Sequence, residues 1–297
     1  RINDSTYTAE LYISYNWTPG TYNWYLTATD NAGNYTPPSP LSRGGITLTT
    51  AATINDEPYF TIQAALNSAN ANDIISVQAG TWTGEGNRGI TWPNTDGITL
   101  QGVSSVDSVL DAEQGTRHIV VPWALGFGIW DLALINGRVS NDTVGHNGGA
   151  VWMDSSARLT MDSCIVSGNS AVNGGAFYDG IKYIVNSEIK NNSAVFGGAF
   201  NDGTIILSES VLRKNSAGND GGLVFNSSVE FTDCEIYENS SADDGGVFYA
   251  VNSTLIGCRI YDNSADGSSA VGGVFMRGSP TLINCLVYNN SASSHAS

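Results

Sequence analysis

Paired glycines and a recurring Asn-Ser step divide the second half of the chain into six units of nearly constant length. The glycine pairs begin at Gly148, Gly174, Gly197, Gly221, Gly245 and Gly272. The asparagines are Asn169, Asn192, Asn215, Asn239, Asn263 and Asn290. In five of the six units the first glycine and the following asparagine are 18 residues apart, and later changes of length fall between an asparagine and the next glycine pair. A fixed frame with one variable corner is typical of a solenoid in which every unit forms one coil.

Two positions of this frame are apolar in every unit and predict strands that face a common core. Eight residues before the asparagines stand Met161, Ile184, Leu207, Phe231, Leu255 and Leu282. Three residues before them stand Val166, Ile189, Leu212, Ile236, Ile260 and Val287. The position between these columns, six before the asparagine, holds turn-forming residues such as Asn186 and Asp233. Each coil is therefore expected to run strand, turn, strand.

The asparagine column itself is predicted to be structural. Side chains stacked at a sharp bend can hydrogen-bond to the backbone and to one another along the solenoid axis. We therefore expect the six asparagines to form a ladder and not a ligand site. The glycine pairs would supply positive φ angles or a close approach of backbones. Phenylalanines three residues after the first glycine are expected to stack in the core, at Phe177, Phe200, Phe248 and Phe275.

The four cysteines occupy one column, five residues before the asparagine. They are Cys164, Cys234, Cys258 and Cys285. Neighbours in register would lie about 4.8 Å apart, but parallel Cα–Cβ directions do not converge as a disulfide requires. We expect four buried, reduced thiols. The cysteines therefore do not indicate whether the protein belongs to an oxidising or a reducing compartment.

Upstream of the repeat, an amphipathic segment is expected to close one end of the solenoid. Thr61 can cap a short helix that places Ile62, Ala65, Leu66 and Ala69 on one side. Such a helix would cover the sheet edges that the first coil otherwise exposes.

The first forty residues follow a different pattern. Alternating aromatic segments at 11–15 and 22–29 flank a turn at 18–21 and predict a hairpin. Residues 24–34 resemble the last two strands of bacterial and archaeal immunoglobulin-like or fibronectin-like surface domains. The proline-rich segment 36–40 is expected to be a stiff linker. The predicted domains are a partial immunoglobulin-like β-sandwich with its linker at 1–40 and a right-handed parallel β-helix at 46–297, divided into cap and irregular coils (46–147) and regular coils (148–297).

The repeat resembles known β-helix families. Coils of 23 to 27 residues with three short strands are similar to the right-handed, pectin-lyase-like fold. The pattern Asn-Ser-Ala followed by Gly-Gly-Ala-Phe or Gly-Gly-Val-Phe resembles the repeats of polymorphic outer-membrane proteins, although their Phe three before the asparagine is Val, Ile or Leu here. The resemblance implies an extracellular or cell-surface structural or adhesive module. It would be a fragment of a larger protein that displays loops or associates with copies of itself in a fibre or sheath, without enzymatic turnover.

The charge balance narrows the range of partners. The chain has 12 Lys and Arg against 28 Asp and Glu, for a net charge of -16. Nucleic acid is therefore not an expected partner, because phosphate binding needs a basic surface. No apolar run of about 18 residues occurs, so no membrane span is expected. Surface glycans and cations remain the expected small partners.

The alternative function is a carbohydrate-binding or polysaccharide-degrading β-helix. Fragments similar to galacturonase motifs occur at Asn94-Thr-Asp96, Gly145-His146, Asp243-Asp244 and Arg259-Ile-Tyr261, but in a different order and several coils apart. The basic residues of the regular coils are assigned to different columns, so no basic cleft is predicted; they are Lys182, Lys190, Arg213, Lys214, Arg259 and Arg277. His118, His146 and His295 lack metal-ligand spacing and are expected at the surface. In this alternative, sugars would bind the exposed aromatics Trp82, Trp92, Trp123 and Trp152.

The variable corner carries carboxylates in three consecutive coils, at Asp220, Asp243, Asp244 and Asp266. Stacking would place them along one ridge at about the inter-strand spacing. Two outcomes are open: the side chains splay into water, or a Ca²⁺ ion binds among them with carbonyl and Asn oxygens completing its shell. No other cofactor is expected.

Sequons of the form Asn-x-Ser/Thr predict glycosylation sites if the source organism modifies its surface proteins. The candidates are Asn16, Asn34, Asn141, Asn191, Asn226, Asn252 and Asn289.

Overall fold

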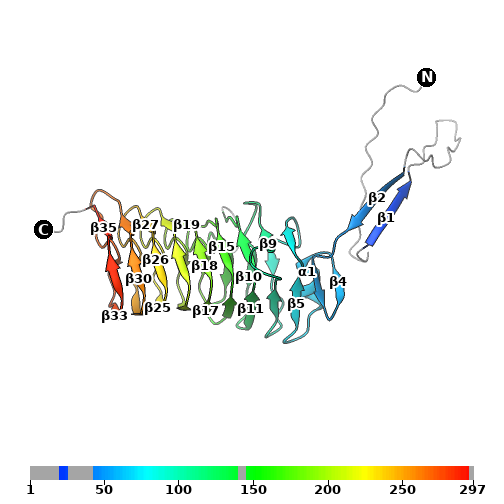
Figure 1. Ribbon diagram of the computed structural model, residues 1–297, viewed down its shortest axis with the longest axis horizontal. Coiled ribbons are helices and arrows are strands. Elements are labelled where there is room, and N and C mark those ends of the chain that lie inside the picture. The colour runs from blue at the N-terminus through cyan, green and yellow to red at the C-terminus, as the bar shows by residue number, and fades with distance from the viewer. Residues whose placement is uncertain (1–19, 26–42, 140–144, 294–297) are drawn as a thin grey trace, which may run out of the picture.

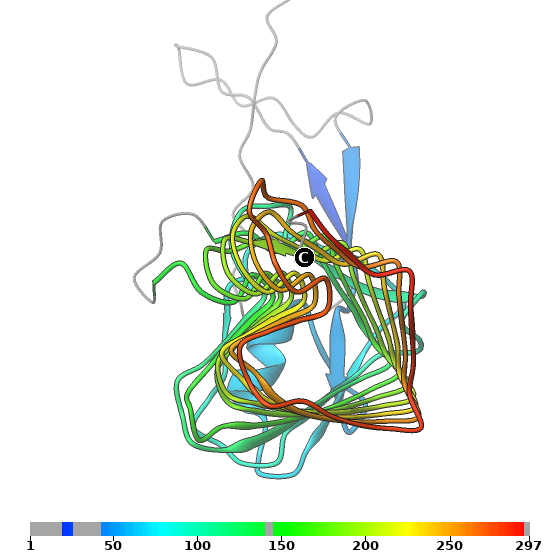
Figure 2. The same cartoon turned by 90° about the vertical axis from the view of Figure 1, so that its left-hand side faces the viewer.

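The chain folds as a parallel β-helix, seen in a computed structural model that describes residues 20–25, 43–139 and 145–293. Successive coils stack along one axis (Figure 1), and viewed down that axis their strands and corners superpose in one outline (Figure 2). Within the described residues, four sheets, here called I to IV, follow the solenoid, and a two-stranded sheet precedes them. The predicted fold class, an all-β parallel solenoid with one short helix, is confirmed.

The sheets are built from one short strand per coil, and neighbours pair in parallel except where β3 pairs antiparallel with β4 and β5. Sheet I contains β7 (Ile90–Thr91), β10 (Ile119–Val121), β13 (Val151–Met153), β16 (Phe177–Tyr178), β20 (Phe200–Asn201), β24 (Val224–Phe225), β28 (Phe248–Tyr249) and β32 (Phe275–Met276). Sheet II contains β4 (Glu57–Tyr59), β3 (Ala52–Ile54), β5 (Ile74–Val77), β8 (Thr99–Gln101), β11 (Gly126–Trp130), β14 (Arg158–Asp162), β17 (Ile181–Val185), β21 (Thr204–Ser208), β25 (Ser228–Thr232), β29 (Asn252–Ile256) and β33 (Thr281–Ile283). Sheet III contains β6 (Gly80–Trp82), β9 (Ser108–Asp111), β12 (Ala133–Ile135), β15 (Ile165–Ser167), β18 (Glu188–Lys190), β22 (Val211–Arg213), β26 (Glu235–Tyr237), β30 (Arg259–Tyr261) and β34 (Leu286–Tyr288). Sheet IV contains β19 (Ser193–Ala194), β23 (Ser216–Ala217), β27 (Ser240–Ser241), β31 (Ser264–Ala265) and β35 (Ser291–Ala292).

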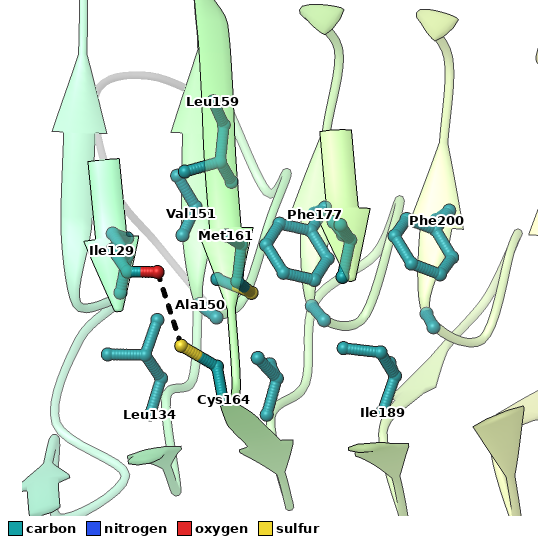
Figure 3. Close-up of a cluster of buried hydrophobic side chains, with 14 of the residues drawn as sticks. Ile129, Leu134, Ala150, Val151, Leu159, Met161, Cys164, Phe177, Ile189 and Phe200 are labelled. Atoms are coloured by element: carbon teal, nitrogen blue, oxygen red, sulfur yellow. Dashed lines mark hydrogen bonds between the residues drawn. The ribbon is translucent and has the colours of Figure 1, made fainter. Parts of the chain in front are cut away.

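The core fills the inside of the coils. The two predicted apolar columns are buried, and residues such as Leu212 have no exposed surface. Leu282, in the last described coil, is 40% exposed because no further described coil packs against it. Phe177 and Phe200 stack with ring centroids 5.2 Å apart and planes 10° apart, and Figure 3 shows them in line with Met161. Burial of each such side chain contributes roughly 1.5–3 kcal/mol, so the aligned columns supply the main driving force for stacking.

The corners depend on residues in the left-handed region of φ. The predicted turn position, six before each asparagine, has φ between +49° and +66° in all six coils. The glycine pair is required by space. A Cβ on Gly198 would lie 2.1 Å from the carbonyl oxygen of Gly222, and a Cβ on Gly175 would lie 2.2 Å from that of Gly198. Neighbouring coils therefore approach one another at this corner more closely than any side chain permits.

The asparagine ladder forms as predicted. Each Oδ1 accepts hydrogen bonds from the backbone N–H and the Nδ2 group of the asparagine one coil earlier, at 2.9–3.1 Å. Each Nδ2 also donates to a backbone carbonyl of the preceding coil, as Asn215 does to Ile189 at 3.0 Å. The ladder begins where Gly137 N–H donates to Asn169 Oδ1 at 2.7 Å. Because Asn169 to Asn263 are almost completely buried, these bonds satisfy amide groups that water cannot reach.

Helix α1 (Ile62–Ser68) covers the first coil. The Thr61 side chain accepts a hydrogen bond from a backbone N–H of the first turn at 3.2 Å, which makes it the predicted N-cap. Ile62, Ala65 and Leu66 are buried, and the helix contacts β3, β4, β5 and β7. The predicted cap is confirmed. Within the described residues, no helix is long and apolar enough to cross a membrane.

Ahead of the solenoid, β1 (Gly20–Tyr25) pairs antiparallel with β2 (Arg43–Leu48). Residues 46–48, which the domain prediction assigned to the β-helix, therefore lie in this two-stranded sheet. The predicted partner strand at 11–15 and the linker at 36–40 lie outside the described residues. The immunoglobulin-like domain stays a prediction.

The cysteine column consists of free thiols, as predicted. Cys164, Cys234 and Cys258 are buried, whereas Cys285 in the last described coil is partly exposed. The Cys164 thiol lies 3.3 Å from the carbonyl oxygen of Ile129 (Figure 3), and burial raises its pKa to about 12. The neighbouring Cys258 sulfur, followed by burial, raises the pKa of Cys234. Cys164 and Cys234 therefore stay protonated and act as small apolar groups at neutral pH, whereas the hydrogen bond with Cys234 lowers the pKa of Cys258 to about 7.

Lys182, one of the basic residues that predict no common cleft, lies in the core. Its position on β17 is in register with the inward-facing Leu159 and Ile205, because alternation along the strand sends every second side chain inward. The side chain turns to the corner, where Nζ donates to the carbonyl oxygens of Asp179 at 2.6 Å and Asp202 at 3.3 Å. Burial lowers the pKa of Lys182 to about 7.

His118 and Trp92 were expected to be exposed, and both predictions are wrong. Both side chains are completely buried, since each belongs to an irregular coil whose register the repeat does not reveal. His118 Nε2 lies 2.9 Å from the carbonyl oxygen of Ile135, and burial lowers its pKa to about 4. Trp92 packs against Phe127 with ring centroids 4.8 Å apart. Neither residue is available to a ligand at the surface.

Candidate functional site

Strand β11 carries glycine at two successive outward positions. Phe127 and Ile129 point inward and are buried, whereas Gly126 is partly exposed on the outer side of sheet II and Gly128 is buried there beneath the Thr99 side chain. Glycine inside a strand often marks a place where a ligand or another backbone approaches closely. Here the two glycines form the floor of a hollow of about 290 Å³, which we call the trench.

Strand register places polar side chains around the trench. Thr99 on β8 lies opposite Gly128, and Thr160 on β14 lies on its other side. Arg158 flanks Gly126, and Tyr183 on β17 follows Thr160 in the next coil. Arg158 and Thr160 are exposed, and Tyr183 is 43% exposed, so their polar groups are accessible from solvent.

Two charged side chains flank Gly126, one from each neighbouring coil. The Arg158 guanidinium group makes no side-chain hydrogen bond or ion pair with any residue in the described ranges. At the opposite edge, Asp96 Oδ1 accepts a hydrogen bond from Gly126 N–H at 2.7 Å, which holds that carboxylate in place. A guanidinium group binds carboxylates with two parallel hydrogen bonds, and hydroxyl groups and an aromatic ring suit a sugar. The trench thus combines the groups needed to hold one acidic sugar residue.

A larger hollow, of about 470 Å³, lies beside α1. Several of its polar side chains already have partners. Gln63 bonds to the backbone N–H and carbonyl of Thr91 at 2.8 and 3.0 Å, and Arg88 pairs with Glu113 at 2.8 Å. The trench is therefore the better candidate, although it is the smaller of the two.

The predicted acidic residues lie at the variable corner, where two of the four carboxylates contact the backbone. Asp220 Oδ1 accepts from Asp244 N–H at 3.1 Å, and Asp244 Oδ1 accepts from Val271 N–H at 2.9 Å. Asp266 accepts from a serine hydroxyl at 2.9 Å. Burial raises the pKa of Asp220. In the part of the chain that the structure describes, no group of three or more His, Cys, Asp or Glu could hold a metal ion, and the calcium site at these residues and Asp243 stays a prediction.

The galacturonase-like fragments do not converge. Asp96 borders the trench, whereas His146 and Asp243 lie at other corners and Arg259 lies on sheet III. The fragments therefore do not form one catalytic group, as their order in the sequence predicted.

The tryptophans of the alternative reading do not form one sugar-binding surface. Trp123 is 42% exposed, and its ring nitrogen donates to the carbonyl oxygen of Trp92 at 3.1 Å. Trp82 and Trp152 are only partly exposed and lie on sheets III and I. The surface aromatic residue that lines the trench is instead Tyr183.

Sequence reasoning missed two features that signals in the chain could have revealed. One is the alternation Gly126-Phe127-Gly128-Ile129, which places both glycines on one side of a strand. The other concerns Lys190 and Arg213. They were assigned to different columns, but both stand two residues before a ladder asparagine and pair in register on sheet III.

The predicted glycosylation candidates divide between described and undescribed parts of the chain. Asn191, Asn226, Asn252 and Asn289 are exposed, as an acceptor must be. Asn16, Asn34 and Asn141 lie outside the described residues. Modification of any of them stays a prediction.

Comparisons with known proteins agree on the fold only. No protein-family model matches the sequence, and no match is found among curated proteins. The solved structures it resembles include a pectin methylesterase from Yersinia enterocolitica (TM-score 0.45, 11% identity, covering 80% of this chain and 94% of that one). They also include an alginate lyase from Paenibacillus sp. str. FPU-7 (TM-score 0.35, 16% identity, covering 78% and 96%). Because both are enzymes, the prediction that this chain is not an enzyme is corrected and is no longer held.

Proposed function

We propose that this chain is a polysaccharide-binding β-helix that holds an acidic sugar residue in the trench. The observation that carries the proposal is the glycine floor at Gly126 and Gly128, beside an exposed arginine that has no partner in the described part of the chain. The partly exposed backbone at Gly126 lets a sugar ring approach the sheet. Arg158 then pairs with the sugar carboxylate, and the Thr160 hydroxyl and Tyr183 contact its ring.

The size of the trench limits what it can take. A volume of about 290 Å³ is at the lower end of the range for small-molecule sites, roughly 300–1,000 Å³, and suits one sugar unit better than several. The trench opens on the outer side of sheet II, so a longer chain can continue from either end of the bound unit. An extracellular or cell-surface location, where such polymers occur, is part of this proposal.

The test is binding of galacturonic acid and short oligogalacturonides, measured by titration calorimetry. Arg158→Gln removes the charge, and Gly126→Ala partly fills the trench without a clash, because its Cβ would be 3.5 Å from Asp96 Oδ1. We expect each variant to bind at least about tenfold more weakly, Arg158→Gln through the loss of one charge-assisted contact and Gly126→Ala through the space that its methyl group takes from the sugar. Thr254→Val, on the outer side of the same sheet three coils after Tyr183, is the matched control.

Two results would reject the proposal. One is equal affinity of the wild type and both trench variants for the acidic sugar. The other is equal binding of the uncharged sugar galactose by the wild type, which would remove the role of Arg158. Chromatography of polygalacturonate after the same incubation shows whether the bound polymer is shortened.

A further inference from the structure

Outward-facing residues of sheet III form a second polar surface in the regular coils. It consists of Lys190, Arg213, Tyr237, Tyr261 and Tyr288 in one column, with Glu188, Glu235 and Arg259 in the column beside it, which also holds the apolar Val211 and Leu286. We call this surface the tyrosine face. Its columns alternate with the buried apolar column of the same strands, so its direction is fixed by the core.

The three tyrosines form a continuous stack. Ring centroids of Tyr237 and Tyr261 are 4.9 Å apart and those of Tyr261 and Tyr288 are 5.0 Å apart, with planes within 7° of parallel. The Arg259 guanidinium carbon lies 5.6 Å from the Tyr261 ring centroid, and the same group pairs with Glu235 at 2.7 Å. Since the ring surfaces cover one another, the ring edges and hydroxyl groups are what a ligand meets. They repeat once per coil along the solenoid axis.

The other end of the tyrosine face carries a surplus positive charge. Glu188 pairs with Arg213 at 2.7 Å and also with Lys190, so one carboxylate serves two cations. Burial works against the charged form of Glu188, but hydrogen bonds from Lys190 and Arg213 outweigh it and lower its pKa. Across the face, three cations and two carboxylates leave a net charge of +1 (3 − 2), in a chain whose net charge is -16.

We infer that the tyrosine face binds an acidic polysaccharide chain running along the solenoid axis. The chain's carboxylate groups meet Lys190 and Arg213, and its hydroxyl groups meet the tyrosine hydroxyls, one coil after another. The excess of positive charge on this face of an acidic molecule fits a polymer of modest negative charge. Nucleic acid fits poorly, because three cations cannot offset the repulsion between its dense phosphates and the rest of the protein.

This inference rests on the proposed function for the class of ligand, but it concerns a different sheet and a different length of polymer. The trench takes one sugar residue, whereas the tyrosine face spans at least five coils, from Lys190 to Tyr288. The two sites can therefore be separated by the size of the probe.

The test is retention of the full chain in gels containing polygalacturonate, with dextran as the uncharged polymer. Lys190→Gln removes the surplus charge while Arg213 keeps Glu188 paired, and we expect it to weaken retention at least fivefold and to flatten its salt dependence. Tyr261→Phe keeps the ring stack but loses one hydroxyl group, and we expect about threefold weaker retention. Ser167→Ala, in the same column one coil before Lys190, is the matched control and should bind like the wild type.

Equal retention of wild type, Lys190→Gln and Tyr261→Phe would overturn the inference, and so would equal retention in dextran gels. A wild type that binds neither polymer would also overturn it and would leave a protein partner for this surface. Failure of the trench has a different signature. In that case galacturonic acid does not bind, while retention of polygalacturonate still depends on Lys190.

Discussion

The regular coils at 148–293 and the irregular coils at 50–147 share the same sheets but use their side chains differently. In the regular coils the inward columns, the asparagine ladder and the glycine pairs are all committed to structure. In the irregular coils the ladder position is occupied by Gly137, and outward glycines open the trench. The residues that repeat therefore determine the fold, and departures from the repeat indicate where a ligand can bind.

The same reasoning applies inside the regular coils. The ladder position is Asn in all six units, whereas the position two residues earlier changes from Ser167 through Lys190 and Arg213 to tyrosine. A position free to vary on an otherwise fixed frame is not needed for folding. It is therefore available to a ligand, and the tyrosine face lies there.

The largest expected effect compares glycine in the two regions. Gly198→Ala places a Cβ 2.1 Å from the Gly222 carbonyl oxygen, and we expect it to lower the free energy of unfolding by about 3 kcal/mol or more. Gly126→Ala meets only ordinary contacts, and we expect stability to be unchanged or raised by about 0.5 kcal/mol. Urea unfolding of the two variants measures this contrast. Similar losses in both would show that the trench glycines are structural too.

The next effect breaks the ladder. Asn215→Ala removes the acceptor of the Asn192 backbone N–H and the donor to the Ile189 carbonyl, and it leaves Asn192 Nδ2 with only its bond to the Val166 carbonyl. Each buried unsatisfied group costs about 1–3 kcal/mol, so we expect a loss of roughly 3–5 kcal/mol after partial relaxation. Exposed Asn252→Ala is the control and should change stability by less than about 0.5 kcal/mol. Thermal unfolding of both variants measures these losses of stability. A small effect at Asn215 would mean that water replaces the hydrogen bonds of the ladder.

A third effect concerns the charge buried in the regular coils. The pKa of Lys182 is about 7 in the folded chain and about 10.4 in the unfolded chain. Between these values the unfolded chain binds more protons, so wild-type stability rises with pH by at most about 1.4 kcal/mol per unit. Lys182→Met lacks this contribution. We expect the stability of the variant relative to the wild type to fall steadily from pH 7 to pH 10, and a constant difference would show that Lys182 does not titrate in this range.

The smallest effect is expected at the acidic ridge. Asp220→Asn keeps an oxygen that can accept from Asp244 N–H, and burial already disfavours the charged carboxylate. We expect a change within about 0.5 kcal/mol in unfolding experiments. Melting the wild type with millimolar calcium and with chelator tests the calcium prediction. A midpoint that rises with calcium in the wild type but not in Asp220→Asn would make this corner a binding site and remove its contrast with the trench.

Most of the fold could be predicted because the information is repeated. Each position of the repeat occurs six times, so positions that are always apolar can be assigned to the core from the sequence alone. The helix cap at Thr61 follows from local sequence. The misplaced residues His118 and Trp92 lie in coils without a repeat, where register depends on distant contacts. The burial of Lys182 could not be predicted for another reason. Its ammonium group is satisfied by carbonyl groups of a corner that the sequence does not show.

The candidate site was harder to predict than the fold. The trench is defined by missing side chains, and it becomes visible only when β8, β14 and β17 are placed on either side of β11. Strand spacing within one coil predicts the columns, but the pairing of coils with unequal lengths must be known before Arg158 can be placed next to Gly126. The charged clusters that are visible in the sequence lie at the variable corner, and they therefore do not indicate a site on sheet II.

The asparagine ladder also gives the molecule an order of assembly. The backbone N–H of each ladder asparagine from Asn169 to Asn263 donates to the Oδ1 of the next coil toward the C-terminus, whereas Nδ2 bonds both to that oxygen and to a carbonyl of the preceding coil. The chain leaves the ribosome with its N-terminus first. At each stage the last folded coil therefore lacks the acceptor for the N–H of its ladder asparagine, and the next coil supplies that acceptor. Folding of this protein would proceed as a directional zipper that keeps pace with synthesis, with α1 closing the end from which it starts.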